Sequence, residues 1–521
     1  MRPKRLLACT LVSVTILGCV ANRPPAKLDA AADLAAERLG QRPEWAASWD
    51  AAPPEWSGEA VLSADEAVAL ALRNNRMLRA DVEMIGQADA DLLQAGLLQN
   101  PMVSLMVMFP DGGGRSMLRG SGVPIQPLQD LWLIPARREV ATAELQQAVL
   151  RVADRAIETA TAVRTAYAKL QYTQRAIALI RDNVQLAEQS VRIIQTRQAV
   201  GQSSQVALNL ARIRVLNLRS ELLTMESDYR AEQRELLLLV GFAGAPDRWT
   251  VAPVHEMTDV LSPPGDEVEL MALGAEQRLD LKAAEWTVQA AERRIALMQR
   301  EGWPDLSLGL SFERAAAPGA ARGPTFGALA GNASAQAVTD RVYGLAPMPK
   351  APMIAPWQPK MREMKWTLGP MLDLEVPLFD QNQAQVAKAR HEYDQKRAQY
   401  EARAQEITRD IRAAVLRQRQ AYDQVELYRS AILPEVERNL GLAQQAFVAG
   451  QEDLTIYLQA QEDVIMTRRK ALEFLRDYYV SGVELERAVG GRIGVEPARE
   501  GEAPAEPRSA APIEVSHERQ D

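Results

Sequence analysis

Ala199-Val200-Gly201-Gln202-Ser203-Ser204 lies within a long helical pattern, and its counterpart Val448-Ala449-Gly450-Gln451-Glu452-Asp453 follows 249 positions later, counted from Gly201 to Gly450. The same offset maps Asp228-Tyr229 onto Asp477-Tyr478, and Val240-Gly241 onto Val489-Gly490. An offset kept over roughly forty residues indicates internal duplication, which decides architecture before local detail does. The chain therefore contains one long unit twice. We predict that each Gly-Gln pair is the tip of a helical hairpin whose arms are the flanking segments.

The composition favours long helices. The 521 residues are rich in Ala, Leu, Arg, Gln and Glu, and only 5% are aromatic. The formal net charge is −8, and the chain has no basic block. An acidic chain of this kind is a poor candidate for nucleic-acid binding, so we expect no nucleic-acid partner.

Residues 1–18 have the pattern of a secretory signal peptide. A basic start is followed by the apolar run Leu6 to Leu17, which is too short to span a bilayer stably as a helix. Cys9 would be removed with this segment, leaving Cys19 as the one remaining Cys and making an intramolecular disulfide impossible. The run ends in Ile16-Leu17-Gly18-Cys19, which resembles the bacterial lipobox and implies a diacylglycerol and acyl anchor on Cys19. The alternative is an ordinary signal peptide with an incidental Cys.

The rest of the chain divides at changes of composition and periodicity. Ser63 with Glu66 forms a capping box that starts a helix running to about Leu98, and Pro135 is expected to open the first long helix. Pro434 interrupts the second long helix. We predict five segments: a lipid-anchored arm (19–62), repeat 1 (63–245), a linker (246–266), repeat 2 (267–491) and a disordered acidic tail (492–521). Repeat 1 contains a β-hairpin at about 101–130 and has its helical tip at 201. Repeat 2 contains a helix from Glu267 to Arg300 and strands at about 304–313 and 366–378, and has its helical tip at 450.

The two strands of the second repeat alternate strictly between apolar and polar or small residues. Strands of this length and pattern can cross a bilayer in a tilted barrel, with the apolar face toward lipid. The alternative is a sheet with one face on a soluble core and the other in water. Four strands cannot close a membrane barrel alone, so the channel interpretation requires oligomerisation. The residues predicted to face lipid are Leu306, Leu308, Leu310, Phe312, Leu372, Leu374 and Val376.

Several short motifs, taken in this order within a duplicated plan, resemble the TolC-type outer-membrane factors, in their lipoprotein branch. The resemblance covers about Ser63 to Gly490, and no single motif decides it. The motifs are Leu98-Gln99-Asn100-Pro101, Gln277-Arg278-Leu279-Asp280-Leu281, Pro304-Asp305-Leu306-Ser307-Leu308-Gly309, Pro377-Leu378-Phe379-Asp380, the two Gly-Gln tips, and Glu484-Leu485-Glu486-Arg487-Ala488-Val489-Gly490.

The resemblance implies a mainly α-helical fold with a membrane β-barrel portion. Three copies would each give four strands to one twelve-stranded outer-membrane barrel, and their long coiled-coil hairpins would form a tunnel through the periplasm. Such a channel is a passive exit duct of a tripartite efflux or type I secretion system, working with a periplasmic adaptor and an inner-membrane pump. The tips, at Gly201, Gln202, Gly450 and Gln451, would form a gate or dock the adaptor.

Members of this family carry acidic residues after the second tip. The corresponding positions here are Ile456 and Gln459, so that ring is absent in its usual form. Glu452 and Asp453 are nearby acids that could replace it, and three copies would form a ring of carboxylates able to bind cations. Equally, these two acids can be ordinary turn residues at a helix N-terminus.

Catalytic and metal sites are not predicted. His255, His391 and His517 lie far apart in sequence, and Gly112-Gly113-Gly114 lacks the Lys and Ser or Thr of a phosphate loop. The alternative to a channel is a lipid-anchored periplasmic coiled-coil adaptor or scaffold, which would need no amphipathic strands. The sequence leaves the cargo open between drugs, metal ions and polypeptides, and does not explain the segment 315–365.

Overall fold

The computed structural model of the chain describes residues 28–45, 61–100, 102–108, 117–242, 249–253, 261–316, 364–452 and 454–493. It forms two compact units, which are described separately. Unit 1 contains Met1–Asp91, Thr142–Gln289 and Asp394–Asp521, and unit 2 contains Leu92–Ala141 and Ala290–Tyr393. Cys19, Asp453, and most of the predicted 315–365 loop and acidic tail lie outside the described residues.

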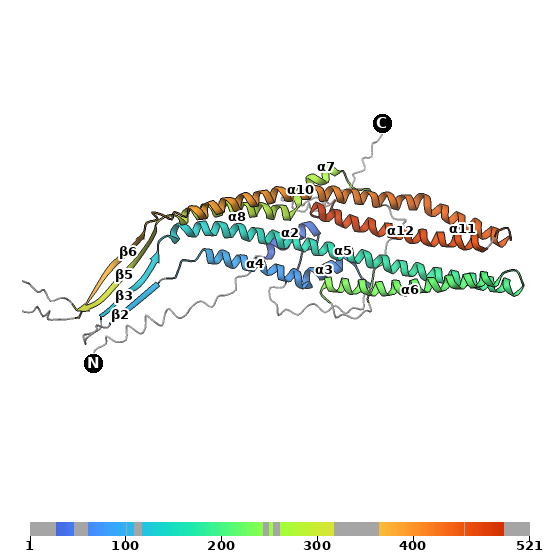
Figure 1. The fold of residues 1–521 in the computed structure, drawn as a ribbon, viewed down its shortest axis with the longest axis horizontal. Coiled ribbons are helices and arrows are strands. Elements are labelled where there is room, and N and C mark those ends of the chain that lie inside the picture. The colour runs from blue at the N-terminus through green and yellow to red at the C-terminus, as the bar shows by residue number, and fades with distance from the viewer. Residues whose placement is uncertain are drawn as a thin grey trace, which may run out of the picture. The chain divides into compact units, whose positions relative to one another are not determined.

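The described chain is mainly α-helical, as predicted (Figure 1). No helix among the described residues combines the length and the apolar character that a membrane crossing requires. The helices are α2 (Leu28–Leu39), α3 (Ala64–Asn74), α4 (Arg76–Ala95), α5 (Asp130–Ala199), α6 (Gln205–Val240), α7 (Glu267–Gln277), α8 (Leu279–Glu301), α10 (Gln383–Leu427), the π-helical turn η1 (Tyr428–Ile432), α11 (Leu433–Val448) and α12 (Leu454–Val489).

Both Gly-Gln pairs lie at turns between antiparallel helices, α5 with α6 and α11 with α12 (Figure 1). Gly201 and Gly450 have φ angles of 75° and 73°, the left-handed conformation that glycine adopts without steric cost. The Gln202 amide donates to the Arg197 carbonyl at 2.8 Å, and the Gln451 amide donates to Ala446 at 2.9 Å. A bond to a carbonyl five residues back defines the Schellman motif, so the two halves end these helices in the same way.

Each predicted leading helix is broken once, contrary to the prediction of continuous helices. Asn75 separates α3 from α4, and Arg278 separates α7 from α8. Asn75 breaks the helix because its Oδ1 accepts bonds from the amides of Met77 and Leu78, at 2.9 and 3.0 Å, and so starts a new helix. The Ser63 cap is present, with its Oγ accepting from the Glu66 amide at 3.2 Å.

The start of α5 also differs from the prediction, because the helix begins at Asp130 and contains Pro135. The amides of Leu131 and Leu133 already bond to the carbonyls of Leu128 and Gln129. Pro135 lacks the N–H that would bond to the Leu131 carbonyl and crowds that carbonyl, yet the helix continues through it. The first proline of a helical pattern was therefore the wrong boundary.

Four strands in unit 2 form one antiparallel sheet in the order β2-β3-β5-β6 (Figure 1). Their bounds are β2 Met102–Met108, β3 Met117–Pro127, β5 Asp305–Ala316 and β6 Met364–Glu375. β6 ends before Val376, which was predicted to lie in the strand. The strand ends there because its partner begins there: Glu375 pairs with Asp305, the first residue of β5.

The predicted arm and linker contain structure that the sequence did not indicate. Within the arm, α2 buries Ala31, Ala32, Ala35 and Leu39. Residues Val61–Leu62 (β1) pair in parallel with Thr250–Val251 (β4), which lies in the predicted linker. Small alanine faces and two-residue strands give almost no periodic signal, which is why both escaped prediction.

Candidate functional site

The tips of the two helical hairpins lie in unit 1 and enclose a cleft of about 670 Å³. Gln202, Gly450 and Glu452 all line it, so the structure brings residues of both predicted tips together. The Ser204 side chain begins α6 by accepting from the Ala207 amide at 3.1 Å. Around Gly201 and Gly450 the space where a Cβ would stand is open. The glycines are therefore required by backbone conformation and not by close packing.

A contact between a cation and an aromatic ring links the two hairpins at this cleft. The Arg197 guanidinium, at the end of α5, lies 4.2 Å from the centre of the Phe447 ring in α11. Phe447 stacks on Tyr457 of α12, with ring centres 5.4 Å apart and planes within 4° of parallel. Contacts between a cation and an aromatic face contribute about 0.5–1 kcal/mol at exposed sites. The sequence did not indicate these contacts of Arg197, Phe447 and Tyr457.

Two ion pairs of opposite polarity join α6 to α12 below the tips. Arg214 of α6 pairs with Glu462 of α12 at 2.8 Å, and Arg469 of α12 pairs with Glu221 of α6. Glu462 is half exposed, so each pair contributes only about 0.2–1 kcal/mol. Each pair spans 248 positions, one fewer than the repeat offset. Opposite charges at that separation were a signal in the sequence that could have located these contacts.

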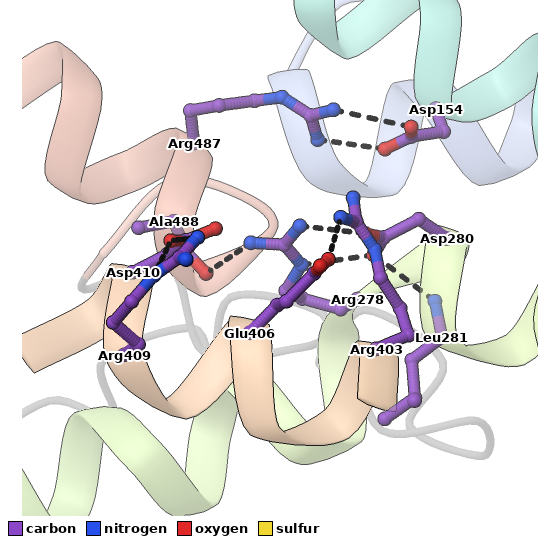
Figure 2. A network of polar contacts seen from close by, with 10 residues as sticks. All are labelled: Asp154, Arg278, Asp280, Leu281, Arg403, Glu406, Arg409, Asp410, Arg487 and Ala488. Atoms are coloured by element: carbon purple, nitrogen blue, oxygen red, sulfur yellow. Dashed lines mark hydrogen bonds and ion pairs between the residues drawn. The ribbon is translucent and has the colours of Figure 1, made fainter. Parts of the chain in front are cut away.

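A buried polar network lies where the short helices meet the long ones in unit 1 (Figure 2). The Asp280 carboxylate accepts from Arg278 at 2.6 and 2.8 Å and from Arg403 at 2.7 and 3.0 Å. Burial alone would raise the pKa of Asp280, but hydrogen bonds and charge from Arg278 and Arg403 outweigh it and lower that pKa to about 2. The carboxylate therefore stays ionised at neutral pH and holds α7, α8 and α10 together.

A second set of ion pairs in unit 1 joins α5 to α12. Arg487 makes a forked contact with Asp154, at 2.6 and 3.1 Å, which Figure 2 also shows. Arg164 pairs with Glu486 at 3.2 Å. Burial raises the pKa of Glu486, and the charge of Arg164 only partly opposes this. A shift of α12 along α5 would separate the partners of both pairs.

The exposed surface of unit 2 includes a row of leucines on the sheet. In the register of β5 and β6, Leu306 faces Leu374, Leu308 faces Leu372, and Phe312 faces Leu368. Leu308, Leu372 and Leu374 are 49%, 62% and 57% exposed, and Val376 just beyond the strand is 53% exposed. Leu306, Leu310 and Phe312 are half-buried. A continuous exposed apolar patch of this kind marks a surface that contacts another protein or lipid.

The described residues contain no group of three or more His, Cys, Asp or Glu side chains that could hold a metal ion. Ile456 is exposed, and Gln459 donates to Asp463 at 3.0 Å. Glu452 also lines a second hollow, which Asp463 and Gln459 share. Among the described residues, the acids that line these two hollows are Glu452, Glu462 and Asp463.

An antiparallel sheet with an exposed apolar face is a feature of outer-membrane β proteins, which turn that face toward lipid. The chain belongs to the outer membrane efflux protein family, whose model matches residues 67–242 and 272–491. That family consists of efflux channels of the outer membrane and not of enzymes.

Individual relatives support this membership. The chain is 22% identical to the cobalt-zinc-cadmium resistance protein CzcC of Cupriavidus metallidurans over 448 residues, which covers 84% of this chain and 92% of CzcC. A membrane protein from Pseudomonas aeruginosa has a similar structure, with a TM-score of 0.62, 21% identity, and coverage of 82% of this chain and 93% of that one. The outer membrane protein VceC from Vibrio cholerae gives a TM-score of 0.60, 17% identity, and coverage of 82% and 96%.

Proposed function

We propose that three copies of the chain form an outer-membrane channel, the exit duct of a tripartite efflux system. The observation that carries this proposal is the open sheet. Strands β2 and β6 each have one unpaired edge within the described residues, and one face of the sheet bears exposed leucines. Backbone groups at a sheet edge cannot remain unpaired in hydrocarbon, so β2 of one copy would pair with β6 of the next until the barrel closes.

In this arrangement the leucine row faces lipid. Leu306, Leu308, Leu310 and Phe312 of β5 join Leu372 and Leu374 of β6, and Ser307 and Asp373 alternate with them toward the lumen. Val376 follows the strand and would lie near the membrane surface. Trp132 and Trp303 pack with ring centres 6.1 Å apart, and Trp303 is exposed. Indole rings favour the membrane–water boundary, so this pair would mark the periplasmic edge of the barrel.

The helical hairpins would form the tunnel, with the tips at its periplasmic mouth. The Arg197–Phe447 contact and the two α6–α12 ion pairs hold the tips of one chain together, and would keep the mouth closed until a partner separates them. Gly201, Gln202, Gly450, Gln451 and Glu452, with Asp453, would form the gate or adaptor-docking surface. The acids after the second tip would make the mouth selective for cations.

The partners and anchor remain those that the sequence predicts. A periplasmic adaptor would dock at the tips and connect the channel to an inner-membrane pump, and an acylated Cys19 would hold the arm in the outer membrane. CzcC is named for resistance to cobalt, zinc and cadmium. We propose divalent metal ions as the cargo. The test is to delete the gene and compare growth on zinc, cobalt and cadmium with growth on hydrophobic drugs. A change confined to the drugs would contradict a metal cargo.

Leu308→Arg tests the lipid-facing assignment, with Ser307→Arg as the matched control on the opposite face of β5. A charged side chain at the bilayer midplane costs about 2–4 kcal/mol, whereas a lumen position tolerates it. Leu308→Arg should reduce the yield of trimer on semi-native gels and the number of conducting channels in planar bilayers, and Ser307→Arg should preserve both. Equal assembly of the two variants would mean that this face does not meet lipid. A mature chain that is a monomer without conductance would support the scaffold alternative.

A further inference from the structure

Methionines gather at one end of the sheet in unit 2. Strand β2 has the sequence Met102-Val103-Ser104-Leu105-Met106-Val107-Met108, and β3 begins at Met117. The chain has 17 methionines among 521 residues, so a stretch of this length would hold less than one at the average frequency. From Met102 to Met117 there are four. The channel fold by itself does not account for this enrichment.

The pairing of β2 with β3 brings three of these methionines together. Met108 lies directly opposite Met117, and Met106 lies opposite Arg119. Alternate residues of a strand share a face, so Met106, Met108 and Met117 lie on one face of the sheet. Positions directly opposite have Cβ atoms about 4.5–5.5 Å apart, and diagonal neighbours such as Met106 and Met117 are about 7–8 Å apart. The register therefore groups three thioether-bearing residues in one small area.

This area belongs to the polar face of the sheet. The row that contains Met106 continues through Arg119 to Glu313 and Thr367. The neighbouring row contains three serines, Ser104, Ser121 and Ser311. Met106 is 57% exposed. An exposed residue in polar surroundings gains little from being apolar, so burial does not account for methionine here.

The other face of the same hairpin carries a different kind of apolar residue. Leu105 and Val107 alternate with the methionines in β2, and the row of Leu105 reaches Phe312 and Leu368. That is the face with the exposed leucines. Leucine and methionine have similar volumes and replace each other readily where only apolar packing matters. Because branched residues occupy one face in these rows and methionines the other, sulfur is what distinguishes the second set.

Thioether sulfur is a soft and neutral metal ligand. Soft sulfur ligands select Cu(I), and by the same chemistry Ag(I), whereas zinc binds better to thiolate, imidazole or carboxylate groups. A thioether has no proton to lose, so a metal bound to it does not compete with protons as it does at cysteine or histidine. Arg119 lies beside the methionines, but Glu313 directly opposite it offsets its charge. The three residues therefore suit a soft monovalent ion better than zinc.

The three methionines lie at the end of the sheet away from the helices that flank it in sequence (Figure 1). β2 follows α4 and β3 leads into α5, so these helices join the strands near Met102 and Pro127. We propose that Met106, Met108 and Met117 form a binding site for Cu(I) or Ag(I) at the free end of the sheet. In the proposed channel this end is the outer mouth, where the site would hold a soft metal ion as it leaves the tunnel. The position at the mouth rests on the proposed function, whereas the binding depends on the sheet alone.

Binding of Ag(I) to the purified full-length protein in detergent tests the site, because silver stays monovalent without a reductant. Met106→Leu, Met108→Leu and Met117→Leu are combined in one variant, since leucine conserves volume and removes the sulfur. Met371→Leu is the control, because Met371 lies on the same polar face opposite Gly309 and has no methionine beside it in the register. Equilibrium dialysis in a chloride-free buffer should show about one ion fewer per chain in the triple variant, and no loss in the control. Equal binding by the triple variant and the unmodified protein would overturn the site.

A second measurement needs no variant and decides the matter if the triple variant fails to assemble. X-ray absorption of the unmodified protein, loaded with one Ag(I) per chain, should show sulfur neighbours around the metal. The bound amount should stay constant between about pH 5 and pH 8, a range over which a histidine site loses its metal. Nitrogen or oxygen neighbours alone, or loss of silver on acidification, would overturn the site.

The site and the channel fail separately. A protein that conducts in planar bilayers, but whose silver binding does not change in the triple variant, would overturn the site and leave the channel intact. A protein that binds silver through these methionines and forms no channel would overturn the proposed function and leave the site intact.

Discussion

Asn75 and Arg278 make the same contact in the two halves of the chain. Asn75 Nδ2 donates to the Leu239 carbonyl at 2.8 Å, and Arg278 Nη1 donates to the Ala488 carbonyl at 3.0 Å. Leu239 and Ala488 are equivalent in the repeat, and each lies near the end of the returning helix, α6 or α12. The broken short helix of each half is thus fastened to the end of its own hairpin by one side chain. Arg278 also donates to the Asp280 carboxylate and so belongs to the buried polar network, of which Asn75 is not a member.

Arg278→Ala should destabilise the protein more than Asn75→Ala. Loss of Arg278 leaves the buried Asp280 carboxylate with Arg403 as its remaining cation, and breaking a buried ion pair costs about 3–5 kcal/mol. Loss of Asn75 removes a cap and one hydrogen bond, at a cost of about 1–2 kcal/mol. Unfolding temperatures of the purified protein in detergent would measure both. Asn75→Asp keeps the cap oxygen and removes the donor, so it separates the two roles of Asn75. If the two alanine variants lose equal stability, the Asp280 network does not contribute more to stability than the Asn75 contacts.

Much of this architecture could be predicted from the sequence, because it follows from periodicity and repetition. The hairpin tips follow from Gly201 and Gly450, since φ angles near 75° favour glycine. The strands β5 and β6 follow from alternation. The break at Arg278 was missed because its side chain bonds to the Ala488 carbonyl, 210 residues away, which no local pattern carries. The break at Asn75 had a local signal, since its side-chain oxygen caps the next helix. The α6–α12 ion pairs had one as well, in opposite charges placed close to the repeat offset.

The two acids with shifted pKa values should give opposite dependences on pH. The pKa of Asp280 is lowered in the folded state, so its stabilisation, about 2 kcal/mol, is complete above pH 4 and is lost as the pH falls toward 2. The pKa of Glu486 is raised, so the folded state binds its proton more tightly, and this group adds stability as the pH falls through its range.

Unfolding temperatures between pH 8 and pH 3 would test this for the unmodified protein, Asp280→Asn and Glu486→Gln. Asp280→Asn should be less stable than the unmodified protein across the neutral range, with the difference shrinking only near the acidic end. Glu486→Gln should lose part of the gain in stability on mild acidification. A variant Glu486→Gln with an unchanged pH profile would show that Glu486 does not titrate differently in the folded state.

The glycines before and after α6, Gly201 and Gly241, should differ in their tolerance of alanine. Gly201 has open space around it, so Gly201→Ala should cost about 1 kcal/mol, from the left-handed backbone alone. At Gly241 the φ angle is 90°, and a Cβ would also lie 2.6 Å from the Asn74 carbonyl oxygen. Gly241→Ala should therefore cost more, about 2–4 kcal/mol, because the backbone at the α3–α4 break must move. Measuring the unfolding temperatures of the two variants compares these costs directly. If Gly201→Ala lowers the unfolding temperature as much as Gly241→Ala does, the space around Gly201 is not open.

The acids of the second tip should control block of the channel by cations. The two tips have the same backbone turn, but Gly201 is followed by Gln-Ser-Ser and Gly450 by Gln-Glu-Asp, so charge is the main difference between them. Three copies would place Glu452 and Asp453 around one narrow mouth, where carboxylates bind multivalent cations and repel anions.

Glu452→Gln with Asp453→Asn should weaken block by a trivalent cation added on the periplasmic side by at least about tenfold, because binding there depends on the number of carboxylates. Ser203→Ala with Ser204→Asn changes the first tip without altering charge or the helix cap and should leave block unchanged. If block is the same in both variants, Glu452 and Asp453 are turn residues that favour the start of α12, and cation selectivity must arise elsewhere in the tunnel.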